Sequence, residues 1–120
     1  MKLLSASLLL LCFSCNRGND LHIKVTDSDD TYEYAARFEP AKSVAVQRFV
    51  NRHIAPTRII SDGDMEVTVV LEDKTKFDYE VFPGELNISL DKSQNSPAGY
   101  ARIKKMCEDL NRIINPKKEE

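Results

Sequence analysis

The sequence predicts a single α+β domain, in which an antiparallel sheet of about five strands carries two helices on one face in the order ββαβββα. Two groups of segments alternate apolar and polar residues, and a stretch with helical periodicity follows each group. The chain has 120 residues, of which 42% are hydrophobic and 30% charged. This composition is typical of one globular domain, which we place at residues 21–116.

The first group of strands is a predicted hairpin. Apolar and polar residues alternate from residue 21 to residue 26 and again from 31 to 38. Between them, the stretch 27–30 consists of Asp and Ser residues, whose side chains bond their own backbone in turns. Two alternating segments around a short polar turn indicate a β-hairpin.

A helix is predicted over residues 41–54. Pro40 suits its first position, where the missing N–H has no helical partner, and Pro56 disfavours helical conformation at the residue before it. An apolar stripe faces the core at Val46, Phe49, Val50 and His53. In the loop that follows, Ile59 and Ile60 are expected to contact the core.

Three further strands are predicted as a meander over residues 65–72, 76–81 and 86–91. Each alternates apolar with polar residues, so one face of the sheet is buried and the other is open. The turns are Asp73-Lys74 and Pro83-Gly84. This periodicity leaves the order of the strands within the sheet undetermined.

The last element is a predicted helix with Ser96 as N-cap and Pro97 as first residue, ending before Pro116. Its apolar stripe consists of Tyr100, Ile103, Cys107, Leu110 and Ile114. Cys107 lies at the centre of this stripe, which favours a buried, unreactive side chain over the alternative of a reactive thiol.

The N-terminus has the features of a secretory signal. Lys2 is followed by an uncharged stretch from residue 3 to residue 15. Thirteen residues are too few to cross a hydrocarbon core of about 30 Å, for which a helix needs about 20. The stretch is therefore interpreted as the apolar region of a signal peptide.

The segment Leu11-Cys12-Phe13-Ser14-Cys15 resembles the lipobox of bacterial lipoproteins, except that Cys12 stands where that family usually has Leu. The resemblance implies cleavage between Ser14 and Cys15 and attachment of a diacylglyceryl group to the Cys15 thiol. Residues 1–14 would then be the signal peptide, residues 15–20 a lipidated tether and residues 117–120 a charged tail. Asn16 replaces the Asp that retains lipoproteins in the inner membrane, which favours the outer membrane. Secretion without lipid and an uncleaved anchor are the alternatives.

The charge balance argues against a nucleic-acid-binding protein. The chain has 17 Lys and Arg residues, 19 Asp and Glu residues and a formal net charge of −2. A nucleic-acid-binding domain usually has a basic patch and a clearly positive charge. Glycine-rich phosphate-binding motifs are absent from the sequence, and no cofactor is expected.

No catalytic or metal-binding motif is present in the sequence. His22 and His53 are its two histidines, and a small hydrolase using His53 with a carboxylate is a minor alternative. Two acidic segments, residues 27–30 and residues 62–66, contain carboxylates at alternate positions, as calcium sites do. Neither fits the EF-hand pattern, so both are interpreted as turns and no metal is expected.

A candidate binding face is predicted on the polar side of the sheet. Ala35, Val70 and Phe82 are apolar residues at positions that point to this side. Charged residues would surround them, namely Glu66, Glu80, Lys76 and Arg37. An apolar patch with a charged rim is typical of protein-binding surfaces. The sequence thus predicts a non-enzymatic binding or accessory module, anchored to the membrane through Cys15, with an envelope protein as partner; a structural envelope component is the alternative.

Overall fold

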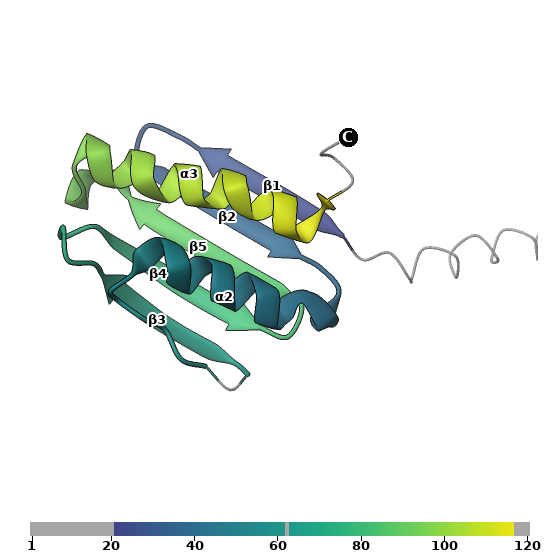
Figure 1. Cartoon of the computed structure of the whole chain (residues 1–120). Helices are drawn as coiled ribbons and strands as arrows, with labels where there is room; N and C mark the ends of the chain where they lie inside the picture. Colours follow the sequence, from purple (N-terminus) through teal and green to yellow (C-terminus); the bar gives the residue numbers. More distant parts are fainter. Residues whose placement is uncertain (1–20, 62, 117–120) are drawn as a thin grey trace, which may run out of the picture.

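The computed structural model describes residues 21–61 and 63–116, which form two layers (Figure 1). One layer is a five-stranded antiparallel sheet, and the other consists of two helices lying side by side on one face of it. The predicted α+β fold and the order ββαβββα are confirmed. The predicted signal peptide (1–14), tether (15–20) and charged tail (117–120) lie outside the described residues.

The strands are β1 (His22–Asp27), β2 (Thr31–Arg37), β3 (Met65–Val70), β4 (Lys76–Phe82) and β5 (Glu85–Asp91). The helices are α2 (Ser43–Ile54) and α3 (Pro97–Ile114), each preceded by a 3-10 turn, η1 (Pro40–Lys42) and η2 (Lys92–Gln94). The sheet order is β1-β2-β5-β4-β3. The connection through α2 leads from β2 to the far edge, and the meander β3–β4–β5 returns so that β5 pairs with β2.

The core lies between the sheet and the two helices. Alternate residues of the three inner strands point into it and are at most 9% exposed, namely Tyr32, Tyr34, Ala36, Phe77, Tyr79, Val81, Leu86, Ile88 and Leu90. The stripe of α3 covers them with Ile103, Met106, Cys107, Leu110 and Ile114. The predicted burial of Cys107 is confirmed, because its side chain is fully enclosed by this core.

Tyrosine hydroxyls tie the sheet to both helices. Tyr34 Oη donates to Asn111 Oδ1 of α3 at 2.7 Å, and Tyr79 Oη donates to Gln47 Oε1 of α2 at 3.0 Å. Burial raises the pKa of Tyr79 to about 12 and raises the pKa of Tyr34 as well. Both phenols therefore remain protonated donors. Because an unpaired buried hydroxyl is unfavourable, these bonds help to specify where each helix lies on the sheet.

The beginning of α3 matches its sequence signals. Ser96 Oγ accepts a hydrogen bond from the Gly99 N–H at 3.0 Å, and Pro97 is the first helical residue. This satisfies one of the N–H groups that a helix start leaves without a partner. Within residues 21–61 and 63–116, neither helix is both long enough and apolar enough to span a bilayer.

Two local predictions are wrong at the margins of the core, and one residue on the core face of a predicted strand is exposed. Ile54, which is 1% exposed, completes the buried stripe of α2 in place of His53. Ile59 is buried as predicted, but Ile60 is 72% exposed. Val67 points to the helix side of β3 and yet is 40% exposed, because β3 is an edge strand. Burial at these positions depends on where the helix layer ends, which periodicity does not specify.

Candidate binding groove

The predicted binding face on the open side of the sheet is not continuous. Val70 pairs with Lys76 at one end of β4, and Phe82 lies at the other end, six residues away or about 20 Å along the strand. Asp78 and Glu80 lie between them on the same face. Ala35 is separated from β4 by the whole of β5. The structure therefore does not bring the three apolar residues together into one patch.

In the first acidic turn considered for calcium, Asp27 is already paired with two lysines. Asp27 pairs with Lys92 at 2.8 Å and with Lys104 at 3.3 Å, and it accepts a 2.6 Å hydrogen bond from Tyr100 Oη. The hydrogen bond from Lys92 is the main cause that lowers the pKa of Asp27 to about 2. Asp62, in the second acidic segment, lies outside the described residues. Among those described, no group of three or more His, Cys, Asp or Glu side chains is arranged to hold a metal ion.

His53 has a carboxylate neighbour and no nucleophile. Its Nδ1 lies 3.1 Å from the Phe49 carbonyl oxygen, and its Nε2 lies 4.0 Å from Asp109 Oδ2. Asp109 is also paired with Lys105 at 3.0 Å. In the described part of the chain, no hydroxyl or thiol forms a hydrogen bond with His53, so the nucleophile–base contact of covalent catalysis is not formed there. His22 is exposed on β1, at the edge of the sheet.

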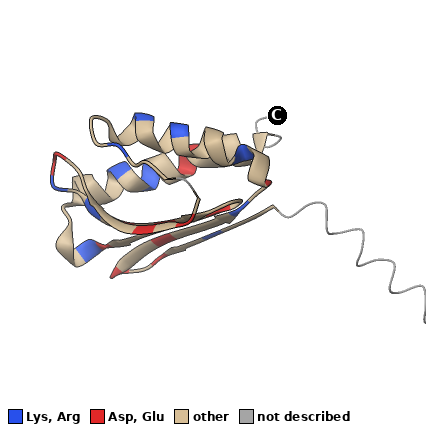
Figure 2. Cartoon of the chain, turned by 90° about the horizontal axis from the view of Figure 1, so that it is seen from below, with Lys and Arg blue, Asp and Glu red and all other residues tan. Residues whose placement is uncertain are grey.

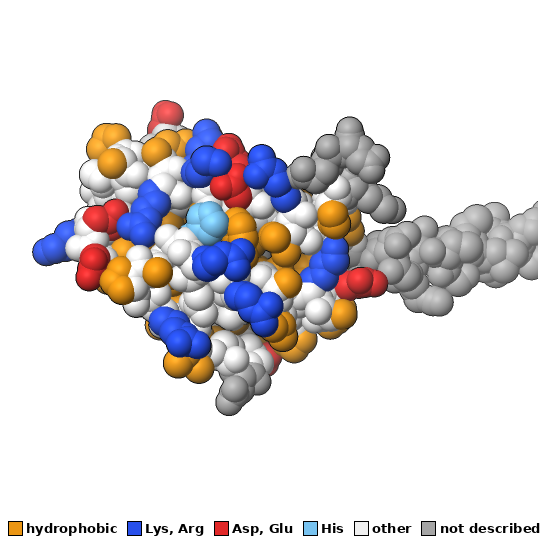
Figure 3. Space-filling view, viewed as in Figure 1, with side chains coloured by type: hydrophobic (Ala, Val, Ile, Leu, Met, Phe, Trp, Pro, Cys, Tyr) orange, Lys and Arg blue, Asp and Glu red, His pale blue; other side chains and the backbone are white. Residues whose placement is uncertain are grey.

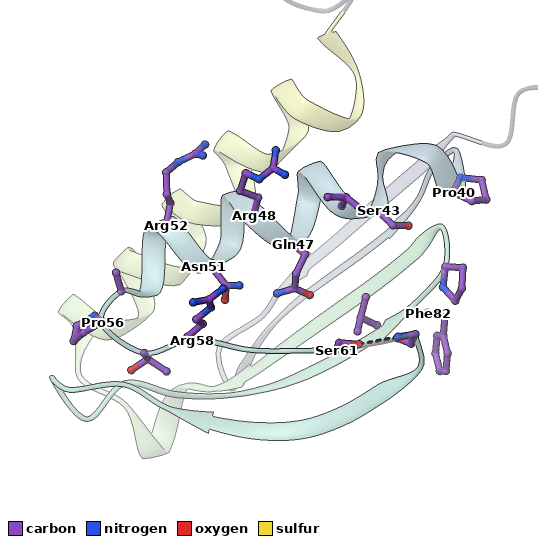
Figure 4. Close-up of a pocket in the computed structure, with 16 residues that line it drawn as sticks. Pro40, Ser43, Gln47, Arg48, Asn51, Arg52, Pro56, Arg58, Ser61 and Phe82 are labelled. Carbon is purple, nitrogen blue, oxygen red and sulfur yellow. Dashed lines mark hydrogen bonds between the residues drawn. The ribbon is translucent and has the colours of Figure 1, made fainter.

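An open groove of about 760 Å³ runs along the outer side of α2 (Figure 4). The helix forms one wall, residues 55–58 continue it around the end of the helix, and residues 81–83 at the end of β4 border the opposite side. Phe82 is thus the one residue of the predicted binding face that lines this groove. The groove exists because α2 covers the middle of the sheet and leaves the region toward β3 uncovered.

The loop after α2 is held in place by one asparagine. Asn51 Nδ2 donates to the Ile59 carbonyl oxygen at 3.0 Å, and Asn51 Oδ1 accepts from the Ile59 N–H at 2.8 Å. The side-chain amide thus pairs with both polar backbone groups of Ile59, as a neighbouring strand would. This pairing fixes the position of Arg58, the adjacent residue, at the groove.

Three arginines line the groove without acidic partners. Arg48 and Arg52 lie one turn apart on α2, and Arg58 comes from the loop (Figure 4). None of them makes an ion pair with a described residue, and none of the described lining residues is acidic. The Arg52 guanidinium lies 5.7 Å from the centre of the Phe49 ring, a contact that leaves its charge uncompensated. Like charges four residues apart on a helix repel, so an anion in the groove is favoured.

A buried amide at the groove has a free hydrogen-bonding group. Gln47 points from α2 toward the strands in Figure 4, and its Oε1 accepts the bond from Tyr79. Its Nε2 is buried and has no hydrogen-bond partner among the described residues. If the amide is turned over, the same position has an unpaired oxygen, so one polar atom lacks a partner in either orientation. Buried groups of this kind are uncommon and call for a ligand or a water molecule.

Charge is divided between the two layers of the molecule. The helices α2 and α3 contain six basic and two acidic residues, a net charge of +4. The five strands contain three basic and seven acidic residues, a net charge of −4. Figure 2 shows acidic residues along the strands, and Figure 3 shows basic side chains gathered over the helices. The groove therefore lies on the positive side of a domain whose total charge is nearly balanced.

The groove was not among the sites predicted from the sequence, although a local signal for it exists. Residues 40–61 contain Lys42, Arg48, Arg52 and Arg58 and no Asp or Glu. Helices of soluble proteins usually have both signs of charge on their exposed side, so this composition indicates a cationic surface. The net charge of −2 does not indicate this cationic surface, because carboxylates in the strands balance its positive charge.

The chain matches none of the protein-family models, curated proteins or solved structures with which it was compared.

Proposed function

We propose that the chain is the precursor of a lipid-anchored protein of the bacterial envelope, whose domain acts as a non-enzymatic binding module. The anchor is supported by the uncharged N-terminal stretch that ends in Ser14-Cys15. The binding role is supported by one observation above the others, which is the groove along α2 with three arginines that lack acidic partners among the described residues.

The groove has the properties of a preformed site. The hydrogen bonds between Asn51 and Ile59 order the loop before any ligand arrives, which reduces the entropy lost on binding. The three guanidinium groups are exposed and available to an anionic partner. An envelope protein is the partner that we propose.

The anchor is tested by Cys15→Ser in a bacterial host. Replacing the thiol should abolish incorporation of labelled palmitate and move the protein from the detergent phase to the aqueous phase in a phase-partition assay. Two acyl chains suffice for stable membrane binding, since each buried methylene contributes about 0.8 kcal/mol. Cys12→Ser is the matched control and should retain the lipid, because Cys12 lies within the proposed signal peptide. Unchanged labelling of Cys15→Ser would contradict the proposed anchor.

The binding role is tested by placing a photo-crosslinking amino acid at either of two exposed valines. Val44 lies at the groove and is 66% exposed, whereas Val70 lies on the open face of the sheet and is 55% exposed. In intact cells, a discrete adduct should form from Val44 and not from Val70. Adducts from Val70 alone would place the partner on the sheet, and no adduct from either position would contradict the proposed binding role.

A further inference from the structure

The spacing of side chains along the groove matches that of an extended peptide. Val44, Arg48 and Arg52 follow one another at intervals of four residues on α2, which corresponds to a rise of about 6 Å per interval. Side chains on one face of an extended chain are two residues apart, which is about 6.6 Å. A peptide lying along α2 therefore places one side chain near each of these three residues.

Arg48 and Arg52 follow one another along α2 and Arg58 lies on the other side of this helix (Figure 4), an arrangement that favours separate carboxylates over a single phosphate. Arg48 and Arg52 lie on successive turns of α2, and Arg58 stands on the loop beyond the end of this helix. Each planar guanidinium can hold one carboxylate by two parallel hydrogen bonds. A single phosphate ion would require donors that converge on one point.

The two ends of the groove differ in polarity. The arginines lie toward the end of α2, whereas the beginning of the helix contributes Val44, which is 66% exposed, and η1 contributes Pro40. Phe82 and Pro83 add further apolar surface on the opposite side. This end of the groove fits an apolar side chain that precedes or follows the acidic residues.

Gln47 provides a group that pairs with a peptide backbone. It lies one residue before Arg48, and its Nε2 is buried without a partner in the described ranges. An extended peptide has a carbonyl and an N–H at every residue, so it can pair with this atom in either orientation of the amide once the Gln47 side chain turns into the groove.

We propose that the groove binds an extended acidic segment of another protein, in which an apolar residue and two acidic residues occupy alternate positions. Such a segment places its apolar side chain near Val44 and its carboxylates near Arg48 and Arg52, with Arg58 adding positive charge from the loop. This inference rests on the proposed function, since it names the ligand of the same groove.

The test compares two fluorescein-labelled peptides with the same composition and charge. One is Leu-Ser-Glu-Ser-Glu, in which the carboxylates share a face with the leucine, and the other is Leu-Ser-Ser-Glu-Glu, in which adjacent carboxylates point to opposite faces. The mature protein is titrated into each peptide in detergent micelles, and fluorescence anisotropy is measured. We expect the alternating peptide to bind about tenfold more tightly, which corresponds to about 1.4 kcal/mol.

Variants connect the binding to the groove. Arg48→Gln and Arg52→Gln should each weaken binding of the alternating peptide about fivefold, because each removes one charge-assisted contact. Arg37→Gln is the matched control, since it removes the same charge from an exposed residue of β2 on the open face of the sheet. Its affinity for the alternating peptide should equal that of the unaltered protein.

Two outcomes would overturn the inference. Equal affinity for both peptides would exclude the proposed spacing. Arginine-dependent binding of inorganic phosphate, or of vesicles containing an anionic phospholipid, without binding of either peptide would exclude the proposed ligand class. Both outcomes are distinct from failure of the proposed function, which is measured by crosslinking at Val44.

Discussion

Among single residues, Asp27 joins the first hairpin to α3 through several polar contacts. Its carboxylate accepts from Tyr100 Oη of α3 and pairs with Lys92 and Lys104. The Lys92 ammonium also lies 4.4 Å from the centre of the Tyr100 ring. The carboxylate of Asp27 is thus shared among groups from two other elements, η2 and α3.

Asp27→Asn should make stability depend less on pH. The pKa of Asp27 falls from an ordinary value of 3.8 to about 2 in the folded protein, so its ionised form stabilises the fold. That contribution is complete above pH 4 and is lost as the pH falls through about 2. Urea unfolding should show a lower midpoint for Asp27→Asn than for the unaltered protein at pH 7, and the difference should shrink between pH 4 and pH 2.

Asp30→Asn is the control for this effect, because Asp30 lies in the same turn and its carboxylate makes no ion pair with a described residue. Its midpoint should follow that of the unaltered protein at every pH. A constant difference between the unaltered protein and Asp27→Asn down to pH 2 would show that the ion pairs do not contribute to stability.

Cys107 should resist thiol reagents in the folded protein. Its side chain is 0% exposed, and burial raises the pKa of its thiol to about 12, so the reactive thiolate is scarce. With Cys12 and Cys15 both replaced by serine, Cys107 is the only remaining thiol. Iodoacetamide labelling followed by mass spectrometry should be negligible in buffer and complete in urea. Rapid labelling in buffer would support the alternative of a reactive thiol.

At the scale of elements, α2 and the loop behind it act as one unit. Asn51 pairs with the Ile59 backbone through two hydrogen bonds, and Ile59 itself is 6% exposed. The loop is therefore anchored by one polar and one apolar contact. Arg58 lies beside the anchored residue, so the shape of the groove depends on Asn51 although this side chain bears no charge.

Asn51→Ala should release the loop and leave the sheet intact. Loss of two partly buried hydrogen bonds should lower the free energy of unfolding by about 1–3 kcal/mol. Hydrogen exchange at the Ile59 amide should be at least about tenfold faster, because a local opening that is easier by about 1.4 kcal/mol occurs about ten times more often. Hydrogen exchange in β5 should be unchanged. Asn51→Asp is the matched variant, because it keeps the acceptor for the Ile59 N–H but loses the donor to the Ile59 carbonyl oxygen, so it should keep part of the protection at the Ile59 amide. Equal exchange at Ile59 in both variants would contradict this account.

At the scale of the whole molecule, one end of the domain holds the beginning of β1, the η1 turn and the end of α3 (Figure 1). Lys42 Nζ donates to the Ile113 and Ile114 carbonyl oxygens at 3.3 and 3.1 Å, which joins η1 to α3. If Cys15 is lipidated as we propose, six residues separate the lipid from Leu21 and span at most about 20 Å. This end of the domain should therefore lie close to the bilayer.

Fluorophores at opposite ends of the domain test this orientation. Glu39→Cys places a label beside η1, and Glu72→Cys places one at the turn between β3 and β4, at the far end of the strands. The lipidated protein is bound to vesicles that contain a lipid-attached quencher. The label at position 39 should be quenched and the label at position 72 should not be. Stronger quenching at position 72 would reverse the proposed orientation.

The candidate site shows which of its features local sequence patterns can predict. The positive charge of α2 is present in the sequence as a segment without acidic residues, and the helix was predicted there. The prediction of one apolar patch on the open face was wrong, because Val70 and Phe82 fit the same alternation and yet lie at opposite ends of one strand pair. Alternation defines the face on which a residue lies, and the strand register defines its position along that face.

Local sequence patterns were enough to predict the order of the elements, the core face of each inner strand and both ends of α3. These features follow from periodicity, turn residues and capping, which act between residues that are close in the chain. Three features emerge only in the folded chain: β5 lies between β2 and β4, Val67 and Ile60 remain exposed, and Arg58 joins Arg48 and Arg52 around one groove. These features depend on contacts between segments that are distant in the chain, and local composition does not specify which of those segments meet.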